Sequence, residues 1–181
     1  MKTALTLSGS TRKGSINQIL QRHIGTKLTA AGVAVTAITL ADYEMPIFNE
    51  DLEAEHTPEA AVRLAELFRS HDIVFWASPE YNGGLTPLTV NTLAWLSRQK
   101  PSPFRHAVFG IGGVSTGKYG TIFGLSHLRD SLSKIGTLVV PTLLGIGPDD
   151  GAFDADGAPV EPAIIRKVDA IVHELTHFSR G

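Results

Sequence analysis

The sequence predicts an α/β fold with an open five-stranded parallel sheet and helices on both faces. Short apolar runs alternate along the chain with segments whose apolar residues recur every three or four positions. The run at 72–77 is apolar from Ile73 onward without alternation, which is typical of a strand that is covered on both faces. Strands that alternate with helices in this way indicate a parallel sheet with crossover connections.

The first half of the chain predicts three strands and two helices. A strand at 3–8 leads into a helix at 15–31, and Gly32 follows as a stop signal. A second strand is expected at 33–40, and residues 42–57 are expected to be irregular. Pro58 suits a first helical position, and the third strand covers 72–77. The helix after Pro58 has an apolar face made of Ala61, Leu64, Ala65 and Phe68.

The second half continues the alternation. After a loop at 79–85, Thr86 caps a helix with Pro87 at its first position, and this helix continues to about Arg98. Strands are expected at 107–112 and 137–140, and a loop at 145–159. Gly136 ends the helix between those two strands. The last helix carries an apolar face of Ile164, Val168, Ile171, Leu175 and Phe178.

Length, charge and composition limit the number of domains and the classes of function that this chain can have. A length of 181 residues without a repeat or linker suits one domain, residues 1–181. The net charge of −2 and the lack of a basic stripe argue against a nucleic-acid partner. No apolar run is long enough for a membrane span, and the N-terminus does not resemble a signal peptide, so a cytoplasmic location is expected. The absence of cysteine excludes disulfides, thiolate nucleophiles and a Cys-x5-Arg phosphatase loop.

The stretch Gly9-Ser10-Thr11-Arg12-Lys13-Gly14-Ser15 has the chemistry of a phosphate cradle. It joins the first strand to the first helix, where unpaired N–H groups and a partial positive charge attract anions. A phosphate loop at this place favours the flavodoxin-like strand order 2-1-3-4-5, in which ligands bind between strands one and three. The loop after strand three is therefore the predicted second half of the site.

That second loop is Ser78-Pro79-Glu80-Tyr81-Asn82-Gly83-Gly84. Its turn-forming residues equally suit a tight connection to the next helix. It also places an aromatic ring and polar groups at the expected ligand edge, which would suit a flat polar heterocycle. Both interpretations stay open on spacing alone.

Three other motifs match known nucleotide-binding or metal-binding patterns only in part. Residues 112–118 fit the start of a Walker A pattern, but Tyr119 stands where Ser or Thr should bind magnesium, and Ser15 stands where the first loop would need the lysine. His173-Glu174-Leu175-Thr176-His177 matches H-E-x-x-H but has no downstream third ligand, and Leu175 belongs to the apolar stripe, so both histidines are expected at the surface. Asp154-Ala155-Asp156-Gly157 is interpreted as a solvated turn rather than a calcium loop.

In several segments the chain resembles the NAD(P)H-dependent FMN reductases. The stretch from Gly9 to Asn17 is similar to their GS-x-R-x-x-S-x-N phosphate loop, and Pro79-Glu80-Tyr81-Asn82-Gly83 to their PEYNG flavin loop. Met45-Pro46-Ile47-Phe48-Asn49-Glu50-Asp51-Leu52 and Phe153-Asp154-Ala155-Asp156-Gly157 also resemble family segments. The matching helix segment holds Asn91, Trp95, Leu96, Ser97 and Arg98, with Val90 and Ala94 in place of the usual lysine and aspartate.

The resemblance implies a flavodoxin-like fold that binds FMN. It assigns the FMN phosphate to Ser10, Arg12, Ser15 and Asn17. It assigns the isoalloxazine ring to Pro79, Glu80, Tyr81, Asn82 and Gly83, mostly through backbone groups, and the pyrimidine edge of the ring to Ser115. It also implies a homodimer or homotetramer with the flavins near subunit interfaces.

The expected function is an FMN-dependent NAD(P)H oxidoreductase that reduces a small-molecule acceptor, with quinones favoured over azo compounds, free flavin or oxidised metal anions. The flavin carries the redox chemistry, so no side chain is assigned as a catalytic acid or base. NADH and NADPH are not distinguished. The alternative is a flavodoxin-type electron carrier without nicotinamide oxidation, although such carriers are strongly acidic and lack an arginine like Arg12. A third is a regulatory protein that keeps the fold without flavin.

Overall fold

A computed structural model describes residues 1–179 of the chain. Its main sheet has five strands in the order β2-β1-β3-β6-β7, all parallel, which confirms the predicted order 2-1-3-4-5. These strands are β1 (Thr3–Ser8), β2 (Ala34–Ala37), β3 (Ile73–Ala77), β6 (Val108–Val114) and β7 (Leu138–Ile146).

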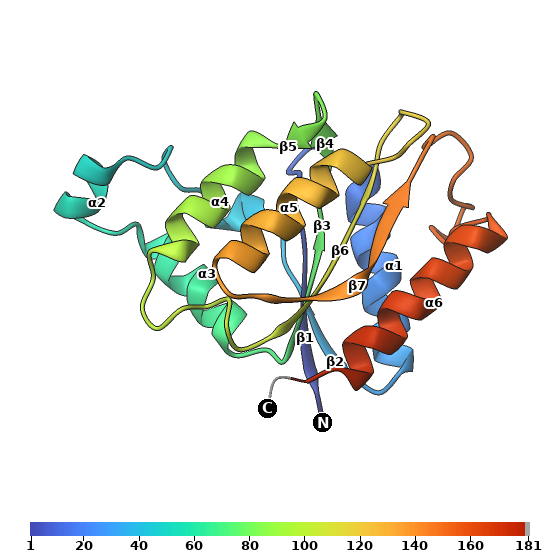
Figure 1. Cartoon of the computed structure of the whole chain (residues 1–181), viewed down its shortest axis with the longest axis horizontal. Coiled ribbons are helices and arrows are strands. Elements are labelled where there is room, and N and C mark those ends of the chain that lie inside the picture. Colours follow the sequence, from blue (N-terminus) through green and yellow to red (C-terminus); the bar gives the residue numbers. More distant parts are fainter. Residues whose placement is uncertain (180–181) are drawn as a thin grey trace.

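Helices cover both faces of the sheet (Figure 1). One face is covered by α1 (Ile16–Ala30) and α6 (Pro162–His177), and the other by α3 (Glu59–Arg69), α4 (Pro87–Ser97) and α5 (Ile122–Lys134). In the central strand β3, Val74 and Trp76 pack towards α3, α4 and α5, while Ile73 and Phe75 pack towards α1 and α6. This double burial is the reason for the apolar run without alternation.

Two short helices lie in the segment that was expected to be irregular. A 3-10 helix, η1 (Leu40–Tyr43), begins where Thr39 accepts a hydrogen bond from the Ala41 N–H, and it shortens the predicted second strand. The helix α2 (Glu50–Glu55) begins at Asn49, whose side chain accepts from the Asp51 N–H. The prediction of irregular structure at 42–57 is therefore wrong at these residues, because local side-chain caps nucleate single turns without an apolar repeat.

The last strand is longer than predicted. The strand was expected at 137–140, yet β7 continues to Ile146. Because β7 lies at the edge of the sheet, the missing N–H of Pro141 costs no ladder hydrogen bond, and the pairing with β6 shifts register between Phe109 and Ile111.

The loop after β3 is a small hairpin formed by β4 (Glu80–Tyr81) and β5 (Gly84–Leu85). Among residues 1–179, no helix combines the length and the apolar character needed to cross a bilayer.

Candidate functional site

Three loops meet at the carboxyl edge of the sheet. They follow β1, β3 and β6, which are neighbours in the sheet, and short hydrogen bonds hold their first residues together. The Gly9 N–H donates to the Ala77 carbonyl at 2.8 Å, and the Ser78 N–H donates to the Gly112 carbonyl at 2.7 Å. The ends of parallel strands at a switch point in strand order thus bring distant segments together, as the fold predicts.

A cleft of about 290 Å³ lies between these loops. All predicted site residues line it except Asn82 and Gly83. Its predicted lining residues are Ser10, Arg12, Ser15, Asn17, Pro79, Glu80, Tyr81 and Ser115.

The first loop gives the cleft an anion-binding end. Ser15 is the N-cap of α1 but makes no capping bond with its side chain, and the first turn of α1 holds no acidic residue. Ser10 and Ser15 are buried, whereas Arg12 is exposed. The positive end of the helix, two hydroxyl groups and a guanidinium therefore share one wall of the cleft.

Gly9 sets the position of this loop against α4. A Cβ atom at Gly9 would lie 2.5 Å from the Thr89 hydroxyl oxygen, which is too close for any other residue type without a shift. The Thr86 hydroxyl donates to the Gly9 carbonyl at 3.1 Å and accepts from the Thr89 N–H at 3.3 Å. The N-cap of α4 thus also fastens the first loop.

Asn17 joins the first loop to the third. Its Nδ2 donates to the Val114 carbonyl at 2.9 Å, and its Oδ1 accepts from the Val114 N–H at 2.9 Å. The residue is only 3% exposed. Its amide therefore fixes the end of β6, immediately before Ser115, to the start of α1.

The hairpin forms the opposite wall. Asn82 and Gly83 have φ angles of 52° and 74°, the positive values that a two-residue type I′ turn requires. They shape the hairpin instead of lining the cleft. The Glu80 carboxylate accepts a hydrogen bond from the Gly124 N–H at 2.8 Å and so holds the hairpin on the first turn of α5. The Tyr81 side chain stays 56% exposed.

Comparison with known proteins identifies the family. Residues 2–149 match the sequence profile of the NADPH-dependent FMN reductases. An NAD(P)H-dependent FMN reductase of Pseudomonas aeruginosa is 37% identical over 84% of this chain and 82% of its own length. A quinone reductase of Escherichia coli is 33% identical over 78% of this chain and 76% of its own.

The chain belongs to the NADPH-dependent FMN reductase family.

Solved structures agree with this assignment. FerB, a flavoenzyme NAD(P)H:(acceptor) oxidoreductase of Paracoccus denitrificans, superposes with a TM-score of 0.82 at 25% identity, covering 99% of this chain and 100% of that one. The expectations of an oxidoreductase, of FMN and of NAD(P)H are confirmed by the family.

The cleft of this FMN reductase fits its cofactor. The uncapped start of α1 with Ser10, Arg12 and Ser15 suits the dianionic phosphate of FMN. Pro79, Glu80 and Tyr81 also line the cleft, where a flat ring with a polar rim would lie.

Four further residues of this FMN reductase line the cleft although sequence reasoning did not select them. They are Ile16, Val114, Thr116 and Asp149. Asp149 follows β7, the next strand along the edge, so the rule that predicted the other loops could have found it. The prediction that the fifth strand ends near residue 140 hid this, because it placed Asp149 far from the strand end.

The H-E-x-x-H motif lies elsewhere. His173 and His177 are exposed, as predicted, and their rings stack at 3.9 Å. The Glu174 carboxylate accepts hydrogen bonds from the N–H and hydroxyl groups of Thr142, so it fastens α6 to β7. No group of three or more potential metal ligands occurs among residues 1–179.

The turn after residue 153 is held by hydrogen bonds within the turn itself. The Asp154 carboxylate accepts from the Asp156 and Ala158 N–H groups, at 2.9 Å each, which is the hydrogen-bond pattern of a tight turn. Val90 and Ala94, which stand in place of the family's usual lysine and aspartate, do not line this cleft but a different hollow between α4 and α5.

Proposed function

We propose that this FMN reductase uses NAD(P)H to reduce a quinone-like acceptor at the cleft between the first loop and the hairpin. The observation that supports this best is the pairing of an anion-binding helix start with the hairpin across one cleft. When bound, FMN supplies the redox chemistry by accepting a hydride from the nicotinamide and passing its electrons to the acceptor. One domain, residues 1–181, carries the whole activity in this proposal.

The residues of the chain bind and orient the cofactor. Ser10, Arg12 and Ser15 hold the phosphate, with Arg12 supplying the charge-assisted contact. Asn17 contributes its backbone N–H from the first turn of α1, because its amide is committed to Val114. The backbone of Pro79, Glu80 and Tyr81 frames the ring, with Asn82 and Gly83 forming the turn of that hairpin, and Ser115 contacts the pyrimidine edge.

The residues near the ring stabilise charge and transfer no protons in this proposal. Glu80 is fastened to α5 by its carboxylate, which leaves it as a support of the hairpin. Arg12 stabilises the negative charge of the phosphate, and the backbone of Glu80 and Tyr81 that of the reduced ring.

The names of relatives support the acceptor class. The relatives from Escherichia coli and Pseudomonas putida are named quinone reductases, and a more distant one from a Bacillus strain, 24% identical, is named an NADPH azoreductase. Quinones are therefore the first acceptor to test, followed by azo compounds, free flavin and oxidised metal anions.

The direct test follows the absorbance of NADH and NADPH with FMN-loaded protein, with and without a benzoquinone. Nicotinamide oxidation that accelerates with the quinone is expected. Bound FMN without nicotinamide oxidation under any condition would contradict the proposal and favour an electron carrier. A protein that takes up no FMN would instead favour the regulatory interpretation.

Two substitutions at neighbouring positions, each of which removes one positive charge, test the proposed phosphate site. Arg12→Ala should raise the FMN dissociation constant about 10- to 100-fold, because it removes a charge-assisted phosphate contact. Lys13→Ala removes the same charge one residue away, at a side chain that does not line the cleft, and should change affinity far less. Equal effects of the two variants in a fluorescence titration of FMN would reject the role of Arg12.

The homodimer or homotetramer and the cytoplasmic location stay predictions.

A further inference from the structure

The loop after β7, residues 147–159, lies at the carboxyl end of the sheet beside the loop after β6 (Figure 1). The Ser115 N–H donates to the Ile146 carbonyl at 3.1 Å, which joins the two loops where they leave their strands. A Cβ atom at Gly147 would clash with the Gly117 carbonyl oxygen, so only glycine allows this close approach without a shift. The start of the loop after β7 is therefore fixed against the third loop of the cleft.

The same loop is held on its other side by the helices behind the sheet. Phe153 packs against the core that α1 and α6 form with the sheet. Gly157 approaches α1 so closely that a Cβ atom there would lie 3.0 Å from the Ile19 side chain. Between these contacts, the Asp149 carbonyl accepts from the Ala152 N–H at 3.1 Å. Asp149 thus belongs to a loop that is anchored on both sides.

Asp149 brings a half-buried carboxylate to the cleft. Within residues 1–179, this carboxylate accepts no hydrogen bond and forms no ion pair. The other carboxylate of the cleft, that of Glu80, is already bonded to the Gly124 N–H. Since a carboxylate that is partly removed from water without a partner costs free energy, we expect a ligand to supply the missing donor.

The chemistry of a carboxylate limits the part of FMN that Asp149 can bind. A carboxylate accepts hydrogen bonds and donates none. It would repel the phosphate, which is itself an anion. The ribityl chain, which joins the ring to the phosphate, has hydroxyl groups that can all donate. The ring has a single N–H, at its pyrimidine edge, so the hydroxyl groups and this N–H are the two possible partners.

The arrangement of the cleft favours the ribityl chain. The proposed phosphate site lies at the start of α1 and the proposed ring site at the hairpin, so the chain between them has to cross the middle of the cleft. Four lining residues have no proposed role, and only Thr116 and Asp149 among them have polar side chains. Of these two, Thr116 is exposed and Asp149 is half-buried.

We propose that the Asp149 carboxylate accepts hydrogen bonds from the ribityl hydroxyl groups of FMN. Asp149 then makes the cleft select a flavin that has this chain over a bare ring. The inference rests on FMN binding and is independent of the acceptor. A failure of nicotinamide oxidation and a failure of this contact are therefore seen in different measurements.

The test compares three flavins by fluorescence titration of the apo protein: FMN, riboflavin, which lacks the phosphate, and lumiflavin, which has a methyl group in place of the whole chain. Asp149→Ala should raise the dissociation constant of riboflavin about tenfold, because it removes a charge-assisted acceptor, and should leave that of lumiflavin within about twofold of the wild type. FMN should lose affinity by the same factor as riboflavin or by less, since the variant also removes a charge that repels the phosphate.

Two further variants serve as controls. Asp149→Asn keeps an acceptor oxygen without the charge and should bind riboflavin with an affinity between those of the wild type and Asp149→Ala. Asp150→Ala removes the same charge at the next position, where the side chain is exposed and does not line the cleft, and should leave the affinity for riboflavin unchanged. Circular dichroism of the apo proteins checks that all variants fold.

Three results would overturn the proposal. An unchanged affinity of Asp149→Ala for riboflavin would show that the carboxylate does not bind the chain. An equal loss of affinity for lumiflavin and riboflavin would place the carboxylate at the N–H of the ring. Tighter binding of FMN together with unchanged binding of riboflavin would show that Asp149 only repels the phosphate.

Discussion

Asn17 shows how one buried side chain can hold two loops of the cleft together. The amide satisfies both the N–H and the carbonyl of Val114, at the point where β6 passes into the loop of Ser115. A backbone segment that is buried at this place would otherwise leave two polar groups without partners, which is costly away from water.

Asn17→Ala is therefore expected to lower the free energy of unfolding of the apo protein by roughly 2–4 kcal/mol, since both groups of Val114 lose their partner. Urea denaturation measures this. Arg22→Ala, at an exposed position of the same helix, is the control and should leave stability within about 0.5 kcal/mol of the wild type. If the two variants unfold alike, the amide does not bridge the loops as described.

At the scale of elements, the hairpin and α5 depend on one carboxylate. Thr121 stands at the N-cap of α5 but makes no capping bond with its side chain, and Glu80 from the hairpin accepts from Gly124 in the first turn instead. A negative charge at a helix N-terminus is also favourable with respect to the helix dipole. The hairpin that forms one wall of the cleft and the helix α5 thus stabilise each other.

Glu80→Ala should lower stability by roughly 1 kcal/mol and weaken FMN binding, because α5 loses an acceptor and the hairpin loses its anchor. Glu80→Gln keeps an acceptor oxygen and should recover most of the stability but not the charge contribution. Thermal unfolding and FMN titration of both variants measure this. Identical behaviour of the alanine and glutamine variants would show that the hydrogen bond to Gly124 contributes nothing.

The elements also show where sequence patterns fail. Periodicity predicted every long helix and every strand of the main sheet, and all of these elements except the exposed strand β2 bury an apolar face. It missed α2, which has no buried residue and forms on an Asn49 cap. It also ended the last strand at Val140, although β7 continues past Pro141, which an edge strand tolerates.

At the scale of the whole molecule, Asp72 links the start of β3 to β1. Its carboxylate accepts from the Thr3 N–H at 2.8 Å and from the Thr3 hydroxyl at 3.0 Å. The N–H bond from Thr3 is the main cause that holds the pKa of Asp72 below its usual range. An ionised carboxylate thereby stabilises the amino ends of β1 and β3, which lie at the other end of the strands from the cleft.

Because the folded-state pKa of Asp72 is lower than the unfolded one, its stabilising effect is complete above the unfolded value of about 3.9 and is lost as pH falls through the folded value. Asp72→Asn should therefore reduce stability at neutral pH and reduce the loss of stability below about pH 4. Urea midpoints between neutral and acid pH measure this, with Asp130→Asn at an exposed position of α5 as control. Parallel pH curves for wild type and Asp72→Asn would contradict the assignment.

The sequence by itself determined the order of the strands and the three loops that meet at the cleft. Those features depend on local signals: apolar periodicity, a glycine- and hydroxyl-rich loop before a helix, and an Asn-Gly turn. The family follows from the same segments, and the binding roles of the ten predicted residues stay predictions.

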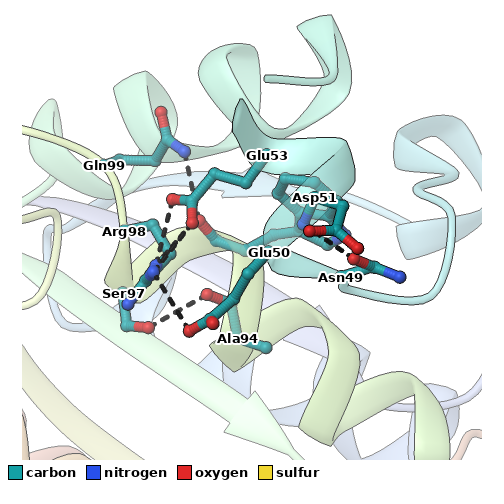
Figure 2. A network of polar contacts seen from close by, with 9 residues as sticks. Asn49, Glu50, Asp51, Glu53, Ala94, Ser97, Arg98 and Gln99 are labelled. Carbon is teal, nitrogen blue, oxygen red and sulfur yellow. Dashed lines mark hydrogen bonds and ion pairs between the residues drawn. The ribbon is translucent and has the colours of Figure 1, made fainter. Parts of the chain in front are cut away.

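Only the tertiary structure decided the partners of those residues. It paired Asn17 with Val114 and Glu80 with Gly124. It also paired the segment at 46–53 with Asn91, Trp95 and Arg98 of α4 and its C-cap (Figure 2 shows the contacts of Arg98). It also brought Asp149 to the cleft and left Ile47 exposed. Such contacts join segments that are far apart in the chain, so they depend on how whole elements pack, and no local pattern of residue types encodes them.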